Sequence, residues 1–190
     1  MKQKLLGFMA LFLSTFISIY AQDAVVVSPD GNLQVQIFVE KGQPLYTVAY
    51  KGKVMLEKSP LGLVTNEGDF STEMKYIGKT ENIIHKKYAE PKIKKSTVEY
   101  SANALTCTFE NIKNRQVSIT FQVSNNDIAF RYEIPAWGER LSCVIEKEVT
   151  GYKFASEATA FLSSMMPPMN AFARTSPSYE SGYTNDLPVA

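Results

Sequence analysis

The sequence has little of the side-chain chemistry that most enzyme active sites use. Its 190 residues include one histidine, His85, and two cysteines, Cys107 and Cys143. A Ser-His-Asp or Cys-His arrangement would have to use His85, which lies in a weakly patterned polar stretch. Zinc sites built on several His and Cys ligands are excluded, and no glycine-rich phosphate loop is present. Paired carboxylates stay open as chemistry for glycoside hydrolysis.

An excess of either charge is also missing. The chain has 20 Lys and Arg against 19 Asp and Glu, for a formal net charge of +1, and 45% of its residues are apolar. This balance argues against nucleic acid or a charged membrane surface as the partner. It is typical of a globular domain, and the length is enough to bury a core.

The two cysteines are too few for a disulfide-dense scaffold. Cys107 lies in an alternating pattern with Leu105 and Phe109, which predicts a small apolar side chain facing a core. A disulfide between Cys107 and Cys143 is the alternative, since export would permit one.

Residues 1–22 are typical of a secretory signal peptide. Lys2 and Lys4 precede an apolar run that continues to Tyr20, and Ala21 supplies a small residue near the expected cleavage point. A membrane anchor is the alternative, but the run is short for a spanning helix and no later stretch is long and apolar enough to cross a bilayer. We therefore expect export to the periplasm or beyond, a mature domain over 23–190, and no membrane contact after cleavage.

The clearest structural signal is the stretch QVSITFQVSNNDIAFRYEIP over 116–135. Apolar and polar residues alternate on both sides of Asn125-Asn126, which predicts two half-buried strands joined by a tight turn with positive φ. The expected apolar pairs are Val123 with Ile128, Phe121 with Phe130, Ile119 with Tyr132 and Val117 with Ile134. Thr120 with Arg131 and Ser118 with Glu133 should fall on the other face, and Pro135 should end the second strand.

Short alternating segments continue along the rest of the chain. We expect strands over 33–39, 46–50, 54–56 and 59–64, around Met74, Tyr76 and Gly78, over 98–100 and 104–109, and within 142–150 and 154–162. Turns are predicted at Ser28-Pro29-Asp30-Gly31, Lys41-Gly42 and Lys51-Gly52. Many short strands without a helical period predict an all-β, antiparallel β-sandwich.

A basic stretch interrupts these strands. His85-Lys86-Lys87 and Lys92-Ile93-Lys94-Lys95 lie where the alternation weakens. One interpretation is a patch for an anionic ligand. The other, which we favour from the sequence, is a solvated strand edge on which lysines discourage unwanted pairing.

Part of the central hairpin, FQVSNNDIAFRYEIP over 121–135, resembles the N-terminal domain of glycoside hydrolase family 97, as do Ser28-Pro29-Asp30-Gly31 and 59–64. The resemblance implies a large super-sandwich of the galactose-mutarotase type, incomplete here at its C-terminal end. In the family, a (β/α)₈ catalytic barrel follows, with an α-glucosidase or α-galactosidase activity whose catalytic residues would lie outside this sequence. An aldose epimerase of related fold typically uses two histidines, so a single His85 argues against it.

The region 167–188, PPMNAFARTSPSYESGYTNDLP, has no strand alternation and predicts a surface loop. Its Phe172, Arg174, Tyr179 and Tyr183 are side chains that could contact a sugar. The segment 178–184 resembles the one through which the family's N-terminal domain lends a glutamate to a calcium ion beside the barrel, and the matching residue is Glu180. The sequence thus predicts a carbohydrate partner, calcium held only together with a barrel, and no catalytic residue. A stand-alone carbohydrate-binding or structural module is the alternative.

Overall fold

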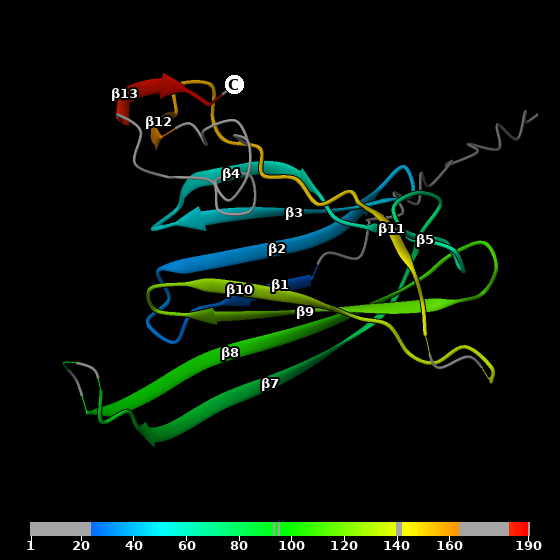
Figure 1. Ribbon diagram of the computed structural model, residues 1–190, viewed down its shortest axis with the longest axis horizontal. Helices are drawn as coiled ribbons and strands as arrows, with labels where there is room; N and C mark the ends of the chain where they lie inside the picture. Colours follow the sequence, from blue (N-terminus) through cyan, green and yellow to red (C-terminus); the bar gives the residue numbers. More distant parts are fainter. Residues whose placement is uncertain (1–23, 93, 95, 140–141, 164–182, 190) are drawn as a thin grey trace, which may run out of the picture.

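The computed structural model describes residues 24–92, 94, 96–139, 142–163 and 183–189, and Figure 1 shows an all-β structure. The described residues form 13 strands and no helix, so none of them lies in a helix able to cross a membrane. The two main layers are four-stranded antiparallel sheets, with strand orders β1-β2-β3-β4 and β10-β9-β8-β7. The predicted antiparallel β-sandwich is therefore confirmed.

The first sheet is a meander of consecutive hairpins. Its strands are β1 (Ala24–Val27), β2 (Leu33–Glu40), β3 (Gln43–Tyr50) and β4 (Lys53–Pro60). Lys41 and Gly42 have φ of 51° and 80°, and Lys51 and Gly52 have φ of 49° and 79°. Two-residue turns with positive φ at both positions match the right-handed twist of the strands they join, so both predicted turns are confirmed.

The second sheet contains the central hairpin in the predicted register. Its strands are β7 (Lys75–Ala89), β8 (Thr97–Glu110), β9 (Gln116–Ser124) and β10 (Ile128–Glu133). Val123 pairs with Ile128, Phe121 with Phe130, and Ile119 with Tyr132. Because β10 ends at Glu133, the expected pairing of Val117 with Ile134 is not part of this ladder, and the strand stops two residues before Pro135.

The turn of this hairpin corrects one detail of the prediction. Neither Asn125 nor Asn126 has a positive φ. The Ser124 amide instead donates to the Asp127 carbonyl at 2.9 Å, and the Ser124 hydroxyl accepts from the amides of Asn126 and Asp127, each at 3.2 Å. A serine side chain thus closes a turn that we had expected Asn residues in the left-handed conformation to close.

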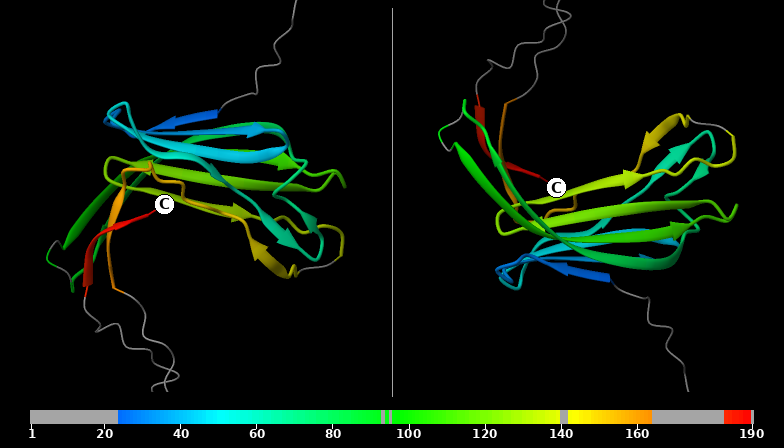
Figure 2. Two further views of the ribbon diagram at one scale, coloured as in Figure 1. Left: turned by 90° about the horizontal axis from the view of Figure 1, so that it is seen from above. Right: turned by 90° about the horizontal axis from the view of Figure 1, so that it is seen from below.

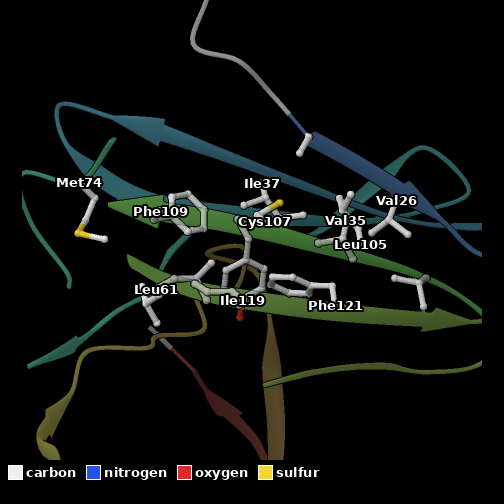
Figure 3. Close-up of a cluster of buried hydrophobic side chains, with 14 of the residues drawn as sticks. Val26, Val35, Ile37, Leu61, Met74, Leu105, Cys107, Phe109, Ile119 and Phe121 are labelled. Carbon is white, nitrogen blue, oxygen red and sulfur yellow. The ribbon is translucent and has the colours of Figure 1, made fainter. Parts of the chain in front are cut away.

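The core lies between the two sheets, as Figures 2 and 3 show. Phe121 stacks on Phe130 with ring centroids 5.3 Å apart and contacts Tyr46 of the facing sheet at 5.6 Å. Cys107 is fully buried in this cluster, as predicted. The other large, fully buried side chains are Phe70, Phe109, Ile37, Leu61, Leu105, Ile119, Val35, Val117 and Val123.

Strands β7 and β8 form a ribbon that extends past the sandwich (Figure 1). The sequence showed weak alternation over 80–95, with a solvated strand edge as the favoured interpretation of its basic stretch, and predicted no strand over 101–103. The edge is confirmed, because β7 is the outermost strand of its sheet, whereas the break at 101–103 is wrong. The ribbon stays paired from Lys75 with Glu110 to Ala89 with Thr97, with one irregularity between Tyr76 and Gly78. Apolar and polar residues alternate only weakly there because this part of the ribbon does not face the core.

Two smaller sheets complete the fold. One consists of β5 (Leu63–Thr65), β6 (Gly68–Asp69) and β11 (Ile145–Glu148), and the other of β12 (Thr159–Ser163) and β13 (Tyr183–Pro188). β11 and β12 are shorter than the predicted segments 142–150 and 154–162. In Figure 1 these two sheets lie at opposite ends of the sandwich.

Candidate functional site

The chain after β10 follows the edge of the sandwich before it forms the β12–β13 hairpin. Backbone amides of Glu57, Val149 and Gly151 donate to the carbonyls of Lys153, Gly62 and Pro60 at 2.7–3.0 Å. Leu56 and Phe154 form an isolated antiparallel bridge. The segment 145–154 is therefore attached to β4, β5 and the connection between them through main-chain hydrogen bonds.

Two tyrosines of the sandwich fix the same segment. The Tyr132 hydroxyl accepts from the Gly62 amide at 2.8 Å and shares a 2.6 Å hydrogen bond with the Thr150 hydroxyl. The Tyr46 hydroxyl donates to the Gly151 carbonyl at 3.1 Å. Burial raises the pKa of Tyr132 and raises that of Tyr46 to about 12, so both hydroxyls are neutral at physiological pH.

Gly62, at the centre of this attachment, has a backbone that only glycine fits. Its φ is 152°, and an added Cβ would lie 2.5 Å from the Ser71 Cβ. The close approach allows the Gly62 amide to reach Tyr132 and the Gly62 carbonyl to reach Val149. The path of the chain toward β12 thus depends on one glycine and two tyrosines of the sandwich.

The β12–β13 hairpin carries an exposed aromatic pair. Phe161 and Tyr183 stack with centroids 4.6 Å apart and planes 5° from parallel, and each is 63% exposed. The register shifts between Ala160 and Leu162, where Asp186 has a φ of 53°. This bulge lies beside the pair and increases the local twist of the hairpin.

The predicted ligand segment 167–188 is described only from Tyr183 onward. Glu180, Phe172, Arg174 and Tyr179 lie outside the described residues, so the expected calcium ligand stays a prediction. The expectation of a loop is wrong for the last residues of the segment, because Tyr183–Pro188 form β13. Cross-strand pairing with β12 stabilises that strand although its own residues do not alternate.

The described residues hold no group of three or more His, Cys, Asp or Glu side chains that could bind a metal ion. His85 lies exposed on β7, where its Nδ1 is 2.8 Å from the Ser101 hydroxyl. Cys107 and Cys143 are free thiols, so the disulfide alternative is not supported. Burial raises the pKa of Cys107 to about 11, which keeps that thiol protonated and unreactive near neutral pH.

A polar cluster at the other end of the sandwich was not found from the sequence. Arg115 forms an ion pair with Glu67, donates to the Glu67 carbonyl at 2.8 Å and lies 5.5 Å from the Trp137 ring. Trp137 stacks on Phe70 at 5.0 Å. A cavity of about 270 Å³ adjoins Trp137, Glu67 and Cys143. Only an aromatic residue in a predicted loop, Trp137, hinted at this packing.

Comparisons with known proteins agree with the fold. The family described as Glycosyl-hydrolase 97 N-terminal matches residues 26–190. A crystal structure of a beta-arabinopyranosidase superposes with a TM-score of 0.82 and 44% identity, over 88% of this chain and 27% of that one. A glycoside hydrolase family 97 enzyme from Pseudoalteromonas sp. strain K8, solved with panose and also with acarbose, superposes with a TM-score of 0.68 and 28% identity, over 76% of this chain and 22% of that one.

A curated relative extends these similarities. It is described as a "Probable retaining alpha-galactosidase" of Streptomyces bingchenggensis (strain BCW-1), and it is 22% identical over 129 residues, which are 68% of this chain and 20% of the relative. The chain thus spans about a fifth to a quarter of the length of the proteins it matches.

Proposed function

The chain belongs to the glycosyl-hydrolase 97 family as its N-terminal domain, and from this we propose that it supports the active site of a glycoside hydrolase without carrying the catalytic residues itself. In this proposal residues 23–190 form the supporting sandwich. The reaction takes place in a (β/α)₈ catalytic barrel that continues the same polypeptide, and the sandwich holds a segment against that barrel.

The attachment of the β12–β13 hairpin is the observation that carries this proposal. Main-chain hydrogen bonds from Val149 to Lys153, with Tyr132 and Tyr46, fix where the hairpin begins. Its strands then hold both ends of the segment 164–182, because Ser163 pairs with Tyr183. A rigid sandwich that fixes both ends of a polar segment is a suitable support for residues that must meet a second domain.

We assign Glu180, three residues before Tyr183, as the contribution of this segment to a calcium site. Calcium prefers carboxylate and carbonyl oxygens and takes about six to eight of them. One carboxylate is far short of that number, so the remaining ligands would come from the barrel. There the ion would supply a fixed positive charge near the bound sugar, while this chain holds the Glu180 carboxylate in place.

We propose that the enzyme containing this domain acts on an α-linked glucoside or galactoside. The similarity to a beta-arabinopyranosidase adds arabinopyranosides as a third candidate class of substrate. The relative at 44% identity acts on a beta-arabinopyranoside according to its name, whereas the structures at 28% identity contain panose or acarbose. A panel of aryl α-glucoside, α-galactoside and β-arabinopyranoside separates these substrate classes. We also propose that residues 1–22 direct export and are then removed.

The first experiment tests the chain alone. Purified 23–190 should not hydrolyse any of the three aryl glycosides above a mock preparation. Turnover that a point mutation in this chain abolishes would overturn the proposal.

The second experiment joins this chain to a catalytic barrel. A chimera replaces the matching segment of the beta-arabinopyranosidase with residues 24–190 of this chain, and calcium affinity and turnover are measured together. Glu180→Gln should lower both the calcium affinity and the turnover. Glu157→Gln, at an exposed position between the attached segment 145–154 and β12, should change neither quantity. Unchanged calcium dependence and turnover in the Glu180→Gln chimera would remove Glu180 from this role.

A stand-alone carbohydrate-binding module is the second candidate, and the exposed Phe161–Tyr183 pair favours it. Exposed aromatic rings that are not needed for a core commonly mark binding surfaces. Binding of a neutral oligosaccharide by 23–190, lost in Phe161→Ala, would support this alternative.

A further inference from the structure

Strand β8 changes the face on which it carries apolar residues. From Leu105 to Phe109 the apolar residues face the first sheet, and Leu105, Cys107 and Phe109 are fully buried. From Val98 to Ala104 they point the other way, while Glu99, Ser101 and Asn103 take the inward positions. The pairing with β7 is regular across this change, so no bulge accounts for it. The sequence itself moves the apolar face from one side of the sheet to the other.

On the partner strand apolar residues lie on both faces: Ile84 and Tyr88 share the outer face, whereas Ile83, which is 79% exposed, lies on the inward face opposite Asn103. Directly paired residues of an antiparallel ladder share a face, and the ladder pairs Ile84 with Ala102, Lys86 with Tyr100, and Tyr88 with Val98. We call this surface the outer arm face. It consists of Ile84, Lys86, Tyr88, Val98 and Tyr100, and it ends at Ala102, which is fully buried. Tyr88 is 45% exposed, and no other strand of the described residues covers it, because β7 and β8 extend past the sandwich here (Figure 1).

The charges of the ribbon also differ between its faces. On the inward face Lys79 forms an ion pair with Glu81 at 2.7 Å, and Lys87 forms one with Glu99 at 2.6 Å. Lys86 on the outer arm face and Lys92 near the tip are exposed, and neither forms an ion pair with any described residue. Residues 79–99 hold six lysines and three glutamates, in a chain whose formal net charge is +1. The unpaired positive charge therefore lies with the tyrosines.

Asp127, in the turn between β9 and β10, is the carboxylate that acts on Tyr100. Burial, Asp127 and Tyr88 all raise the pKa of Tyr100, so that hydroxyl stays protonated and can donate a hydrogen bond. Lys86 lies directly opposite Tyr100 in the ladder, and Lys92 lies farther along the ribbon, near its tip. The outer arm face thus carries one positive charge beside Tyr100, with a second positive charge near the tip.

We propose that the outer arm face binds an anionic polysaccharide. The rings of Tyr88 and Tyr100 would contact the apolar faces of successive sugars, and Lys86 and Lys92 would pair with their carboxylates. This proposal rests on the proposed function only in that the ligand is taken to be a glycan. The combination of the exposed Tyr88 ring with the unpaired cations Lys86 and Lys92 on the same ribbon is what selects an acidic glycan.

Other polyanions fit this surface less well. A membrane surface would call for several large apolar side chains at the tip, whereas the sequence of 90–96, EPKIKKS, contains only Ile93. Nucleic acid would call for a strongly basic domain, whereas the formal net charge of this chain is only +1. Both are kept as outcomes of the test.

The test measures binding of the 23–190 chain to polygalacturonate by affinity electrophoresis and calorimetry, with neutral dextran as the matched glycan. We expect retention by polygalacturonate, none by dextran, and weakening as salt rises because the contacts are exposed. Lys86→Gln and Tyr88→Ala should each weaken binding, and the double variant should lose about tenfold or more. Lys87→Gln, adjacent in sequence but ion-paired on the other face, is the control and should keep its affinity.

Several results would overturn the proposal. These are no retention by polygalacturonate, equal loss in Lys87→Gln, or equal binding to dextran. Equal affinity for vesicles of phosphatidylglycerol or for single-stranded DNA would replace the glycan with a general polyanion. Lys86 is exposed and forms no ion pair with a described residue, so we expect Lys86→Gln to leave the fold unchanged. The catalytic chimera does not use this face, and the two proposals therefore fail separately.

Discussion

The sandwich up to Glu133 and the chain after it are built on different principles. Among the described residues, all the buried apolar side chains lie between Ala24 and Val123. No described residue beyond Glu133 is buried, and nine large apolar side chains there are exposed: Val144, Ile145, Tyr152, Phe154, Phe161, Leu162, Tyr183, Leu187 and Val189. The first region is held by its core. The second is held by main-chain hydrogen bonds, two tyrosine hydroxyls and the packing of partly buried side chains such as Trp137, which stacks on Phe70.

This difference separates the region that stabilises the fold from the region that is available to pack against another domain. Removal of apolar surface from water stabilises the sandwich by itself. The later chain has no such core, so it should open locally at a free energy well below that of global unfolding. Exposed apolar surface on that scale is also what a region requires when it packs against another domain.

The largest expected effect separates two phenylalanines. Phe121→Ala removes a fully buried ring that contacts Phe130 and Tyr46, and it should lower the free energy of unfolding by about 3–5 kcal/mol. Phe161→Ala removes a ring that is 63% exposed and should change it by about 0.5 kcal/mol or less. Urea melts measure both. Equal losses would mean that the later chain shares the core.

A smaller effect is expected at Thr120, on the outer face of the hairpin. Its hydroxyl lies 2.8 Å from that of Thr106 and donates to Glu133 at 2.9 Å, and the side chain is buried. Thr120→Ala should therefore cost about 1–2 kcal/mol, more than an exposed residue but less than Phe121. A loss as large as that of Phe121→Ala in the same urea melts would contradict the assigned facing.

Tyr132→Phe tests the junction between the two regions. It removes the hydroxyl that bonds Gly62 and Thr150 while it keeps the ring. We expect local destabilisation of about 0.5–1.5 kcal/mol, seen as faster amide hydrogen exchange at Val149 and Gly151. Exchange in β8 and β9 should change much less. A uniform increase over both regions would show that they unfold as one unit.

The two cysteines give a comparison without any mutation. Cys107 is buried and its pKa is raised to about 11, so little thiolate forms near pH 7. Cys143 is only partly buried in the loop before β11. Alkylation with iodoacetamide in the folded protein should modify Cys143 first, and Cys107 should react only as the sandwich unfolds. Mass spectrometry of the peptides shows which cysteine is modified first. Early labelling of Cys107 would contradict its burial in the core.

The sequence predicted the first region well because its pattern and its environment agree. Alternation around Asn125-Asn126 fixed the register of the hairpin, since a slip of one residue would expose Phe121 and Phe130. The prediction was wrong for the turn, which is closed by hydrogen bonds to the Ser124 hydroxyl and has no positive φ at Asn125 or Asn126. The prediction was also wrong where β8 changes its apolar face, because we expected every strand to place its apolar residues toward one core.

The later chain was harder to predict for a physical reason. β13 is a strand because β12 pairs with it, and neither strand has a buried face that would impose alternation. The cluster of Glu67, Arg115 and Trp137 joins loops that are far apart in sequence, and no local pattern records such contacts. Family resemblance, and not periodicity, pointed to Glu180.

The strand order of the two main sheets has a consequence for how the chain folds. In both sheets every strand pairs with its neighbour in sequence, and the sheets span 24–60 and 75–133. Contacts within each sheet are therefore local, and local contacts form with little loss of loop entropy. Docking of one meander on the other and pairing of β11 with β5 bring together distant parts of the chain. We therefore expect these long-range steps, and not the formation of either meander, to limit the folding rate.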